Sequence, residues 1–132
     1  MSGPVDPDVV ELAARVFDLA RAGAADELAE HVRAGVPANL TNGAGDTLLI
    51  LAAYHDHPAA VVRLLELGAD PARVNDRGQT ALAAAAFRRS APSVEALLDA
   101  GADPDGGGPS ARETAAFFGL TEMSALLDRP RG

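Results

Sequence analysis

Lysine, cysteine and tryptophan are absent from this chain of 132 residues, so all 11 of its basic residues are arginine. The lack of cysteine excludes disulfide bonds, thiolate nucleophiles and zinc sites built on thiolates. Acidic residues outnumber basic ones, 19 to 11, which gives a net charge of −8. A chain this acidic is unsuited to phosphate backbones or anionic lipids, so we expect no nucleic-acid partner and no membrane partner.

Long apolar segments are missing as well. Nowhere does the chain contain roughly 18 consecutive apolar residues, the length that a membrane-spanning helix needs. Residues 1–8 are acidic and lack the apolar segment of a secretory signal. We therefore expect a soluble, cytoplasmic protein. The exclusive use of arginine, with abundant alanine, glycine and proline, indicates a bacterium whose genome is rich in G and C.

Aromatic residues make up only 4% of a chain that is 48% hydrophobic, and alanine supplies much of the apolar share. Alanine favours the helix and lets neighbouring helices approach closely. The composition thus predicts small helices packed against one another.

The chain does contain a regular internal repeat. Gly-Asp-Thr at 45–47 returns as Gly-Gln-Thr at 78–80, and Gly-Ala-Asp-Pro at 68–71 returns at 101–104, in each case 33 positions later. A fixed period of this length is typical of proteins built from stacked units, and it divides the chain into about four of them.

Apolar residues at three- and four-residue spacing, together with capping and turn residues, predict two short helices in each unit. The first begins with Asp6 as its N-cap and Pro7 in its first turn, and its apolar stripe includes Val9, Leu12 and Val16. The segments between units are rich in glycine, proline and asparagine, which predicts turn-rich loops. The predicted helices cover residues 7–21, 25–33, 47–54, a segment that ends near 67, 80–88, 92–100, a segment that opens at 110, and 121–128.

The loops and helix starts resemble those of ankyrin repeats, units of about 33 residues with a turn and two helices. The family pattern Asp-x-x-Gly-x-Thr has close counterparts at 42–47, 75–80 and 105–110. This resemblance implies an all-α solenoid of helix-turn-helix units joined by β-hairpin-like loops, forming a single domain over 1–132. The implied units, with the first and last acting as caps, are 7–39, 40–74, 75–104 and 105–128, followed by a tail at 129–132.

Two departures from the family pattern lead to further predictions. The family's Thr-Pro-Leu-His motif reads Thr47-Leu-Leu-Ile50 and Thr80-Ala-Leu-Ala83 here. Because the missing histidine forms a hydrogen bond between units in the family, its loss implies that packing holds this stack together. Gly101 and Ser110 are 9 positions apart, against 12 for the corresponding residues of earlier units. We expect a shortened last loop, followed by a capping box from Ser110 to Glu113.

Few residues have catalytic or metal-binding potential. His31 is expected to pack on its helix. His55-Asp56-His57 resembles a metal or acid–base cluster, but adjacent residues rarely converge on one ion, and His57 matches a turn histidine of the family. The glycines at 106–108 lack the lysine of a phosphate-binding loop and suit a shortened turn. We predict no catalytic residue, no metal site and no cofactor, and hence a protein that is not an enzyme.

The remaining candidate is the surface formed by equivalent positions of successive units. The ends of the first helices fall in one row, which contains four of the five aromatic residues, Phe117 among them. Aromatic residues and arginine are common interface anchors, and the resemblance implies that the concave face binds proteins. The predicted partner-binding residues are Arg21, Tyr54, His55, Phe87, Arg88 and Phe118 in the row and Asp76, Arg77 and Gln79 in a loop.

Two hypotheses for the function follow. In the first, the protein is a monomeric, non-catalytic adaptor that binds a protein partner through its concave face and its loop tips. In the alternative, it is an acidic inhibitor or regulatory subunit that occupies a basic site on an enzyme or a nucleic-acid-binding protein. Binding would weaken markedly with ionic strength in the second case and little in the first.

Overall fold

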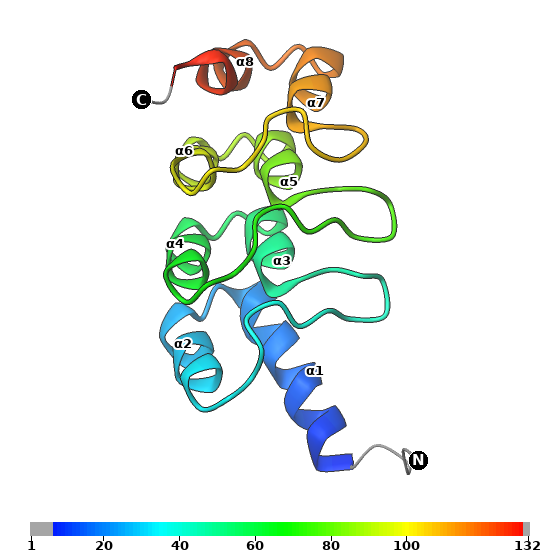
Figure 1. Ribbon diagram of the computed structural model, residues 1–132, viewed down its shortest axis with the longest axis vertical. Coiled ribbons are helices and arrows are strands. Elements are labelled where there is room, and N and C mark those ends of the chain that lie inside the picture. The colour runs from blue at the N-terminus through cyan, green and yellow to red at the C-terminus, as the bar shows by residue number, and fades with distance from the viewer. Residues whose placement is uncertain (1–6, 131–132) are drawn as a thin grey trace.

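In the computed structural model, which describes residues 7–130, eight helices follow one another and no strand occurs among these residues (Figure 1). The prediction of an all-α fold is confirmed. Asp6, the predicted N-cap, and residues 131–132 of the predicted tail lie outside the described residues. The helices are α1 (Pro7–Ala22), α2 (Ala25–Arg33), α3 (Leu48–Tyr54), α4 (Pro58–Glu66), α5 (Ala81–Phe87), α6 (Ala91–Asp99), α7 (Ala111–Phe117) and α8 (Thr121–Asp128).

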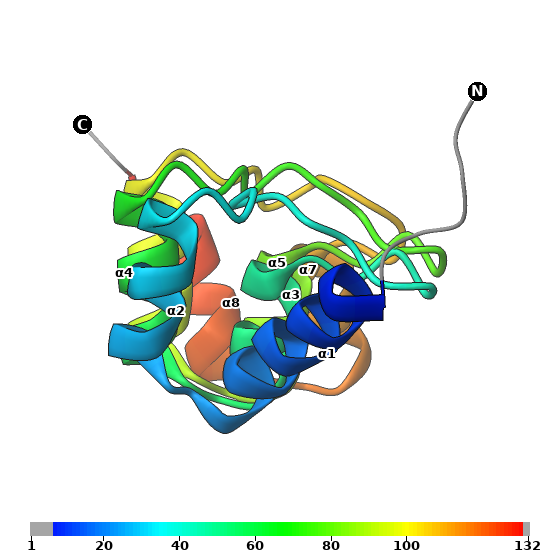
Figure 2. The ribbon, with the colours of Figure 1, turned by 90° about the horizontal axis from the view of Figure 1, so that it is seen from below.

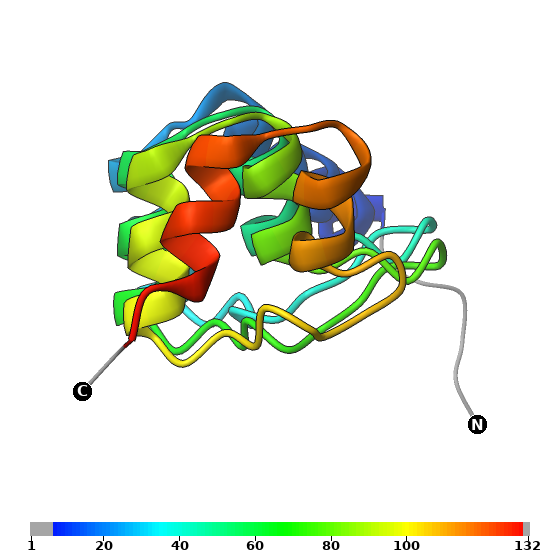
Figure 3. The same cartoon turned by 90° about the horizontal axis from the view of Figure 1, so that it is seen from above.

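The helices form two rows. An inner row of α1, α3, α5 and α7 packs beside an outer row of α2, α4, α6 and α8 (Figure 1). Viewed along the stack, the long loops cross one side of both rows and project past the inner one (Figures 2 and 3). The structure is therefore the predicted solenoid, with each helical pair contacting the next. None of the helices within residues 7–130 has the length and apolar character needed to cross a bilayer.

Hydroxyl side chains set the starts of the inner helices. The Oγ1 atoms of Thr47 and Thr80 accept hydrogen bonds from the backbone N–H groups of Ile50 and Ala83, at 3.0 and 3.1 Å. Each satisfies an N–H group that has no partner inside its helix. Ser110 forms the predicted capping box, because Glu113 also accepts from its N–H at 3.0 Å.

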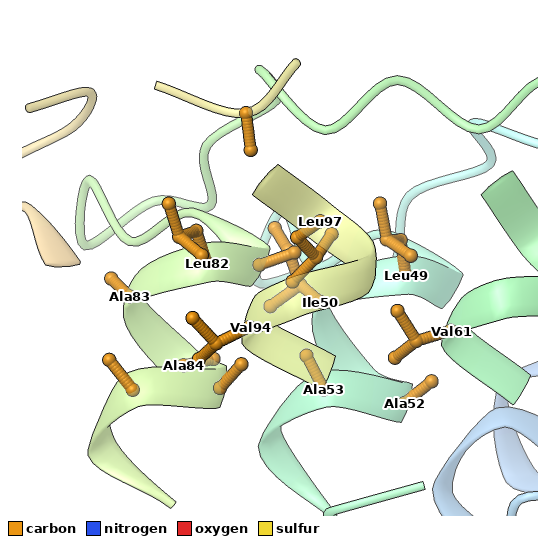
Figure 4. Close-up of a cluster of buried hydrophobic side chains, with 14 of the residues drawn as sticks. Leu49, Ile50, Ala52, Ala53, Val61, Leu82, Ala83, Ala84, Val94 and Leu97 are labelled. Atoms are coloured by element: carbon orange, nitrogen blue, oxygen red, sulfur yellow. The ribbon is translucent and has the colours of Figure 1, made fainter. Parts of the chain in front are cut away.

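Alanine brings the inner helices close together. All six residues from Ala81 to Ala86 are buried in α5, and the leucines between the rows are buried with them. In the view of Figure 4, Ile50 of α3 and Leu97 of α6 appear between Leu82 of α5 on one side and Leu49 of α3 on the other. Full burial of one such side chain contributes about 1.5–3 kcal/mol to stability. Because every helical pair supplies buried residues, the core is a strip that runs the length of the stack.

The first half of α1 departs from the predicted apolar stripe. Val16 is buried as expected, but Val9 and Leu12 are 56% and 39% exposed. The reason is length, since α1 has 16 residues whereas α3, on which it packs, has 7. The first turns of α1 therefore extend beyond the helices that would cover them (Figure 1).

Hydrogen bonds join the units, so the prediction that packing alone holds the stack is wrong. His57 donates from Nε2 to the carbonyl oxygen of Arg21 at 2.7 Å. Polar groups of the loops form further hydrogen bonds between units, and none of these involves the position of the missing family histidine. They run from the Asp70 N–H to Asn39 Oδ1 at 2.7 Å, from Asp76 N–H to the Ala44 oxygen at 3.0 Å and from Gly108 N–H to the Gly78 oxygen at 3.0 Å.

Candidate functional site

Each of the three short inner helices ends at an aromatic residue, and the stacking places these rings side by side. Tyr54 and Phe87 are stacked, with ring centroids 6.4 Å apart and planes 8° from parallel. Phe118 then meets Phe87 edge to face at 5.4 Å and Phe117 at 4.9 Å. We call Tyr54, Phe87, Phe117 and Phe118 the aromatic row. The ends of successive inner helices, together with Phe118 just after the last, thus form one continuous surface.

The aromatic row lies at the surface rather than in the core. Tyr54 and Phe87 are 37% and 41% exposed, and Phe118 and Phe117 are 52% and 82% exposed. Rings that filled gaps between alanine-rich helices would be buried. A contiguous exposed apolar surface on a folded protein is a common mark of an interaction site.

One hollow, of about 250 Å³, lies beside Tyr54. It brings together five of the residues predicted from the sequence, which come from α1, the end of α3 and the loop before α5. Asp46 also lines it, as do two apolar residues of α3. We call it the Tyr54 hollow. Its lining consists of Arg21, Asp46, Ile50, Leu51, Tyr54, His55, Arg77 and Gln79.

A second hollow, of about 270 Å³, is lined by two rings of the row, Phe87 and Phe118. Its lining includes three predicted residues, Phe87, Arg88 and Phe118, together with Arg89 and Leu120. We call it the Phe87 hollow. It combines two cations with apolar walls, and no carboxylate is among its lining residues.

Most of the arginines that line the two hollows have no ion pair, Arg21 with its contact to Asp18 being the exception. Among the described residues, six arginines form ion pairs with Asp or Glu, and the unpaired ones are Arg33, Arg77, Arg88 and Arg89. Three of these four line the two hollows. The guanidinium of Arg88 instead lies over the Tyr54 ring, 5.9 Å from its centroid, which is within the range of a cation–π contact.

The surroundings of His55 reflect the same positive charge. Partial burial, followed by the charges of His57, Arg21 and Arg88, lowers the pKa of His55 from its ordinary value. Its ring meets Tyr54 edge to face at 5.3 Å. The neutral imidazole is therefore the form that this site favours near neutral pH.

Asn75 shapes the loop that supplies Arg77 and Gln79. Its Oδ1 atom accepts from the backbone N–H groups of both residues at 3.0 Å, and its amide donates to Asp46 at 2.9 Å. Asn75 itself is only 5% exposed. The loop is thus held against the preceding one, with Arg77 directed to the Tyr54 hollow.

Asp76 is the one predicted site residue that neither hollow includes. It is exposed at the loop tip, and its backbone N–H donates to the preceding loop. Its carboxylate lies next to Gly45, where an added Cβ would come within 2.6 Å of Oδ1. Asp76 belongs to the contact between loops.

The sequence candidates for other chemistry have structural roles. His57 uses Nε2 to join two units, and His31 is half-buried on α2. Gly107 faces the preceding loop so closely that an added Cβ would lie 2.5 Å from the Gly78 oxygen. Within residues 7–130, no three His, Cys, Asp or Glu side chains are grouped so that they could hold a metal ion.

Sequence reasoning missed Arg89 and Leu120, which complete the Phe87 hollow. Arg89 has a positive φ of 58°, and it occupies the turn position that Gly23 and Gly119 hold in the first and last helical pairs. The sequence did contain a signal for Arg89, because an arginine stands at a turn where the first and last units have glycine. Leu120 carries no such mark, because its sequence position indicates only a turn.

Comparison with known proteins agrees with this architecture. A family model described as ankyrin repeats in three copies matches residues 16–106. A protein of Pseudomonas aeruginosa that is named as an ankyrin repeat protein is 45% identical over 60 residues, which are 46% of this chain and 34% of that protein. The match thus spans about a third of the curated relative's length. Helices α7 and α8 lie beyond the residues that the family model covers.

Proposed function

Because this chain belongs to the ankyrin repeat family, we propose that it is a non-catalytic adaptor that binds a protein partner through the aromatic row and the adjacent loops. Ankyrin repeats are in general modules for protein–protein interaction. The observation that carries the proposal is the row itself, four exposed rings in mutual contact across three helical pairs.

The physical basis is the kind of surface that the row provides. Aromatic side chains and arginine supply large contact areas and are enriched where binding energy concentrates. Tyr54 and Phe87 also end short helices that are packed into the core, and Phe118 directly follows a third. A partner would therefore meet anchors that are already in place, which lowers the entropy cost of binding.

The proposal extends to the setting of the protein. We place it in the cytoplasm of a bacterium, as the arginine-rich, lysine-free composition and the Pseudomonas relative suggest. We also propose a monomer whose units have the bounds given above. The partner contacts would then be made by single chains, with Asp76, Arg77 and Gln79 contributing from the loop.

The experiment compares the wild type with a Tyr54→Ala/Arg88→Glu variant as tagged baits in the cytoplasm of the source cell. The matched control is Val62→Ala/Arg33→Glu on the outer helices, because Val62 is 43% exposed and Arg33 has no ion pair among the described residues. Circular dichroism verifies that each variant is folded.

We expect mass spectrometry to identify a protein that the wild type and the control retain and the Tyr54→Ala/Arg88→Glu variant loses. Identical catches from all three baits would exclude the aromatic row as the binding surface. Loss in the outer-helix control alone would instead place the binding surface on the outer helices.

A further inference from the structure

We propose that the Phe87 hollow, lined by Phe87, Arg88, Arg89, Phe118 and Leu120, recognises an acidic segment of the partner, in which a carboxylate side chain stands beside an apolar one. This inference rests on the proposed function and specifies the chemistry of the partner. It follows from three features of the hollow, which concern charge, backbone geometry and shape.

The first feature is the absence of neutralising carboxylates. Six other arginines are paired, as Arg63 is with Asp26 at 2.8 Å and Arg21 with Asp18 at 3.0 Å. In the part of the chain that the structure describes, neither Arg88 nor Arg89 has an ion pair. Because both arginines line the hollow, their like charges are unfavourable together, and a carboxylate from outside would offset this.

The second feature is the backbone at Arg89. Four turns join the helices within the pairs, and their residues with positive φ are Gly23, Asp56, Arg89 and Gly119. A φ of 58° is unfavourable for an arginine, whose Cβ crowds the backbone there. Glycine would fit this turn without strain. The arginine therefore places a cation at the hollow at the cost of backbone strain. Strain of this kind is concentrated at binding sites.

The third feature is the apolar wall. Phe87 and Phe118 stand edge to face at 5.4 Å, and Leu120 also lines the hollow. The hollow has a volume of about 270 Å³, several times the roughly 30 Å³ that one water molecule occupies. An apolar side chain can therefore enter beside the two arginines.

Acidic groups near this face do not pair with its arginines. Asp46 lines the neighbouring Tyr54 hollow and accepts from Asn75. Glu122 lines an adjoining hollow that shares Arg89, Phe118 and Leu120 with the Phe87 hollow, and it forms no ion pair among the described residues. The net charge of −8 belongs to the whole chain. At physiological ionic strength charges are screened beyond about 8 Å, so the arginines of the hollow dominate for a segment that docks there.

The test uses a displayed library of random short peptides, selected on the immobilised wild-type chain. Selected peptides are synthesised with their acidic residues intact and with Asn or Gln in place of Asp or Glu. Their affinities are measured for the wild type, for Arg88→Glu/Arg89→Glu, for Tyr54→Ala/Phe118→Ala and for the charge control Arg33→Glu.

We expect selection to enrich peptides with Asp or Glu next to Phe, Leu or Trp. Affinity should fall at least ~10-fold in Arg88→Glu/Arg89→Glu and in the amide peptides, the size expected when two exposed ion pairs are lost or reversed. Arg33→Glu should bind as the wild type does.

Two other outcomes separate this inference from the proposed function. Enriched peptides that are neutral or basic, and that lose affinity only in Tyr54→Ala/Phe118→Ala, would overturn the acidic partner but keep the binding surface. Peptides whose affinity none of the variants changes, or a selection without enrichment, would overturn both.

Discussion

Arg89 combines an unfavourable backbone conformation with a charge that no described residue neutralises. Its φ of 58° places it in the left-handed region, as does the 59° of Asp56 at the equivalent turn. Such a position costs a residue other than glycine about 1–2 kcal/mol. The two turns therefore allow the same substitution to be compared inside and outside the Phe87 hollow.

We predict that Arg89→Gly raises the free energy of unfolding by about 0.5–1 kcal/mol, because relief of the strain exceeds the added entropy of the unfolded chain. The same change should weaken the binding of acidic peptides. Asp56→Gly, the matched control, should also stabilise the protein but leave binding unchanged. Urea unfolding and peptide affinity are measured for both variants. An Arg89→Gly variant less stable than the wild type would contradict the claim that the backbone at Arg89 is strained.

At His55 the lowered pKa gives the stability a pH dependence of definite sign. Burial, with the charges of His57, Arg21 and Arg88, disfavours protonation in the folded state, whereas the unfolded chain protonates near pH 6.5. The unfolded state therefore binds more protons below that pH, and stability falls as the pH decreases. Arg77 and Asp46 line the same hollow.

We expect His55→Gln to reduce the loss of stability between neutral pH and pH 5. Urea unfolding of the wild type and the variant across this range measures the effect, and the two curves should converge at neutral pH. An unchanged slope in His55→Gln would show that protonation of this residue does not oppose folding.

Among the elements, the inner helices differ in what covers them. Ala86 of α5 and Ala116 of α7 both lie six residues after their N-cap, yet Ala86 is buried and Ala116 is exposed. The difference arises because α7 packs on α5, while no described helix follows α7 in the inner row. Burial here is a property of the position in the stack rather than of the residue.

We predict that Ala86→Leu lowers the free energy of unfolding by about 1–3 kcal/mol, since a larger side chain must separate α5 from α7. Ala116→Leu, the control at the equivalent position, should change it by less than about 0.5 kcal/mol. Chemical denaturation of both variants provides the comparison. Equal losses would mean that the inner helices are not packed as closely as the structure indicates.

The loop before α5 depends on the side chain of Asn75. Asn75→Ala removes two acceptor contacts to backbone N–H groups and the bond to Asp46. Because these groups become unsatisfied, we expect a loss of about 1–3 kcal/mol in the free energy of unfolding. Binding of peptides should weaken as well, since Arg77 and Gln79 lose their placement.

Asn39→Ala serves as the control for this loop. Asn39 accepts from the Asp70 N–H at 2.7 Å, and it lines neither the Tyr54 hollow nor the Phe87 hollow. Its loss should reduce stability without reducing affinity. If Asn75→Ala bound peptides as tightly as Asn39→Ala, the loop would have no part in recognition.

The sequence predicted the elements well because their signals are local. Thr47, Thr80 and Ser110 mark helix starts that the structure places within one residue, and the period of the repeat puts successive helices in register. The exposure of Val9 and Leu12 was not predictable in this way, since it depends on how far α2 and α3 reach along α1. Hydrogen bonds between loops, such as that of Asp76, likewise depend on the spacing of units.

The aromatic row could be predicted from the same register, whereas the pairing of the arginines beside it could not. Counting positions from each N-cap places Tyr54, Phe87 and Phe117 at corresponding helix ends. The pairing of arginines is a property of three-dimensional neighbours, however, and the sequence contains no sign that Arg63 is paired and Arg88 is not. The two hollows therefore required the structure.

For the whole molecule, stacking separates the charges of an acidic chain. Carboxylates are numerous on the outer helices, where they pair with arginine, as in the contacts of Arg63 with Asp26 and of Arg129 with Glu95. Three of the four unpaired arginines among the described residues instead lie beside the aromatic row, in a loop and a turn next to the inner helices. A chain with a net charge of −8 thus presents one face suited to an acidic partner.

The most direct test is amide chemical-shift mapping of the labelled protein by NMR, with an acidic peptide selected from the displayed library. The account predicts that the largest shift changes fall at Tyr54 and His55, at residues 75–79, at 87–89 and at 117–120. Changes centred on α2, α4 and α6, with the aromatic row unaffected, would contradict it and would assign binding to the outer face.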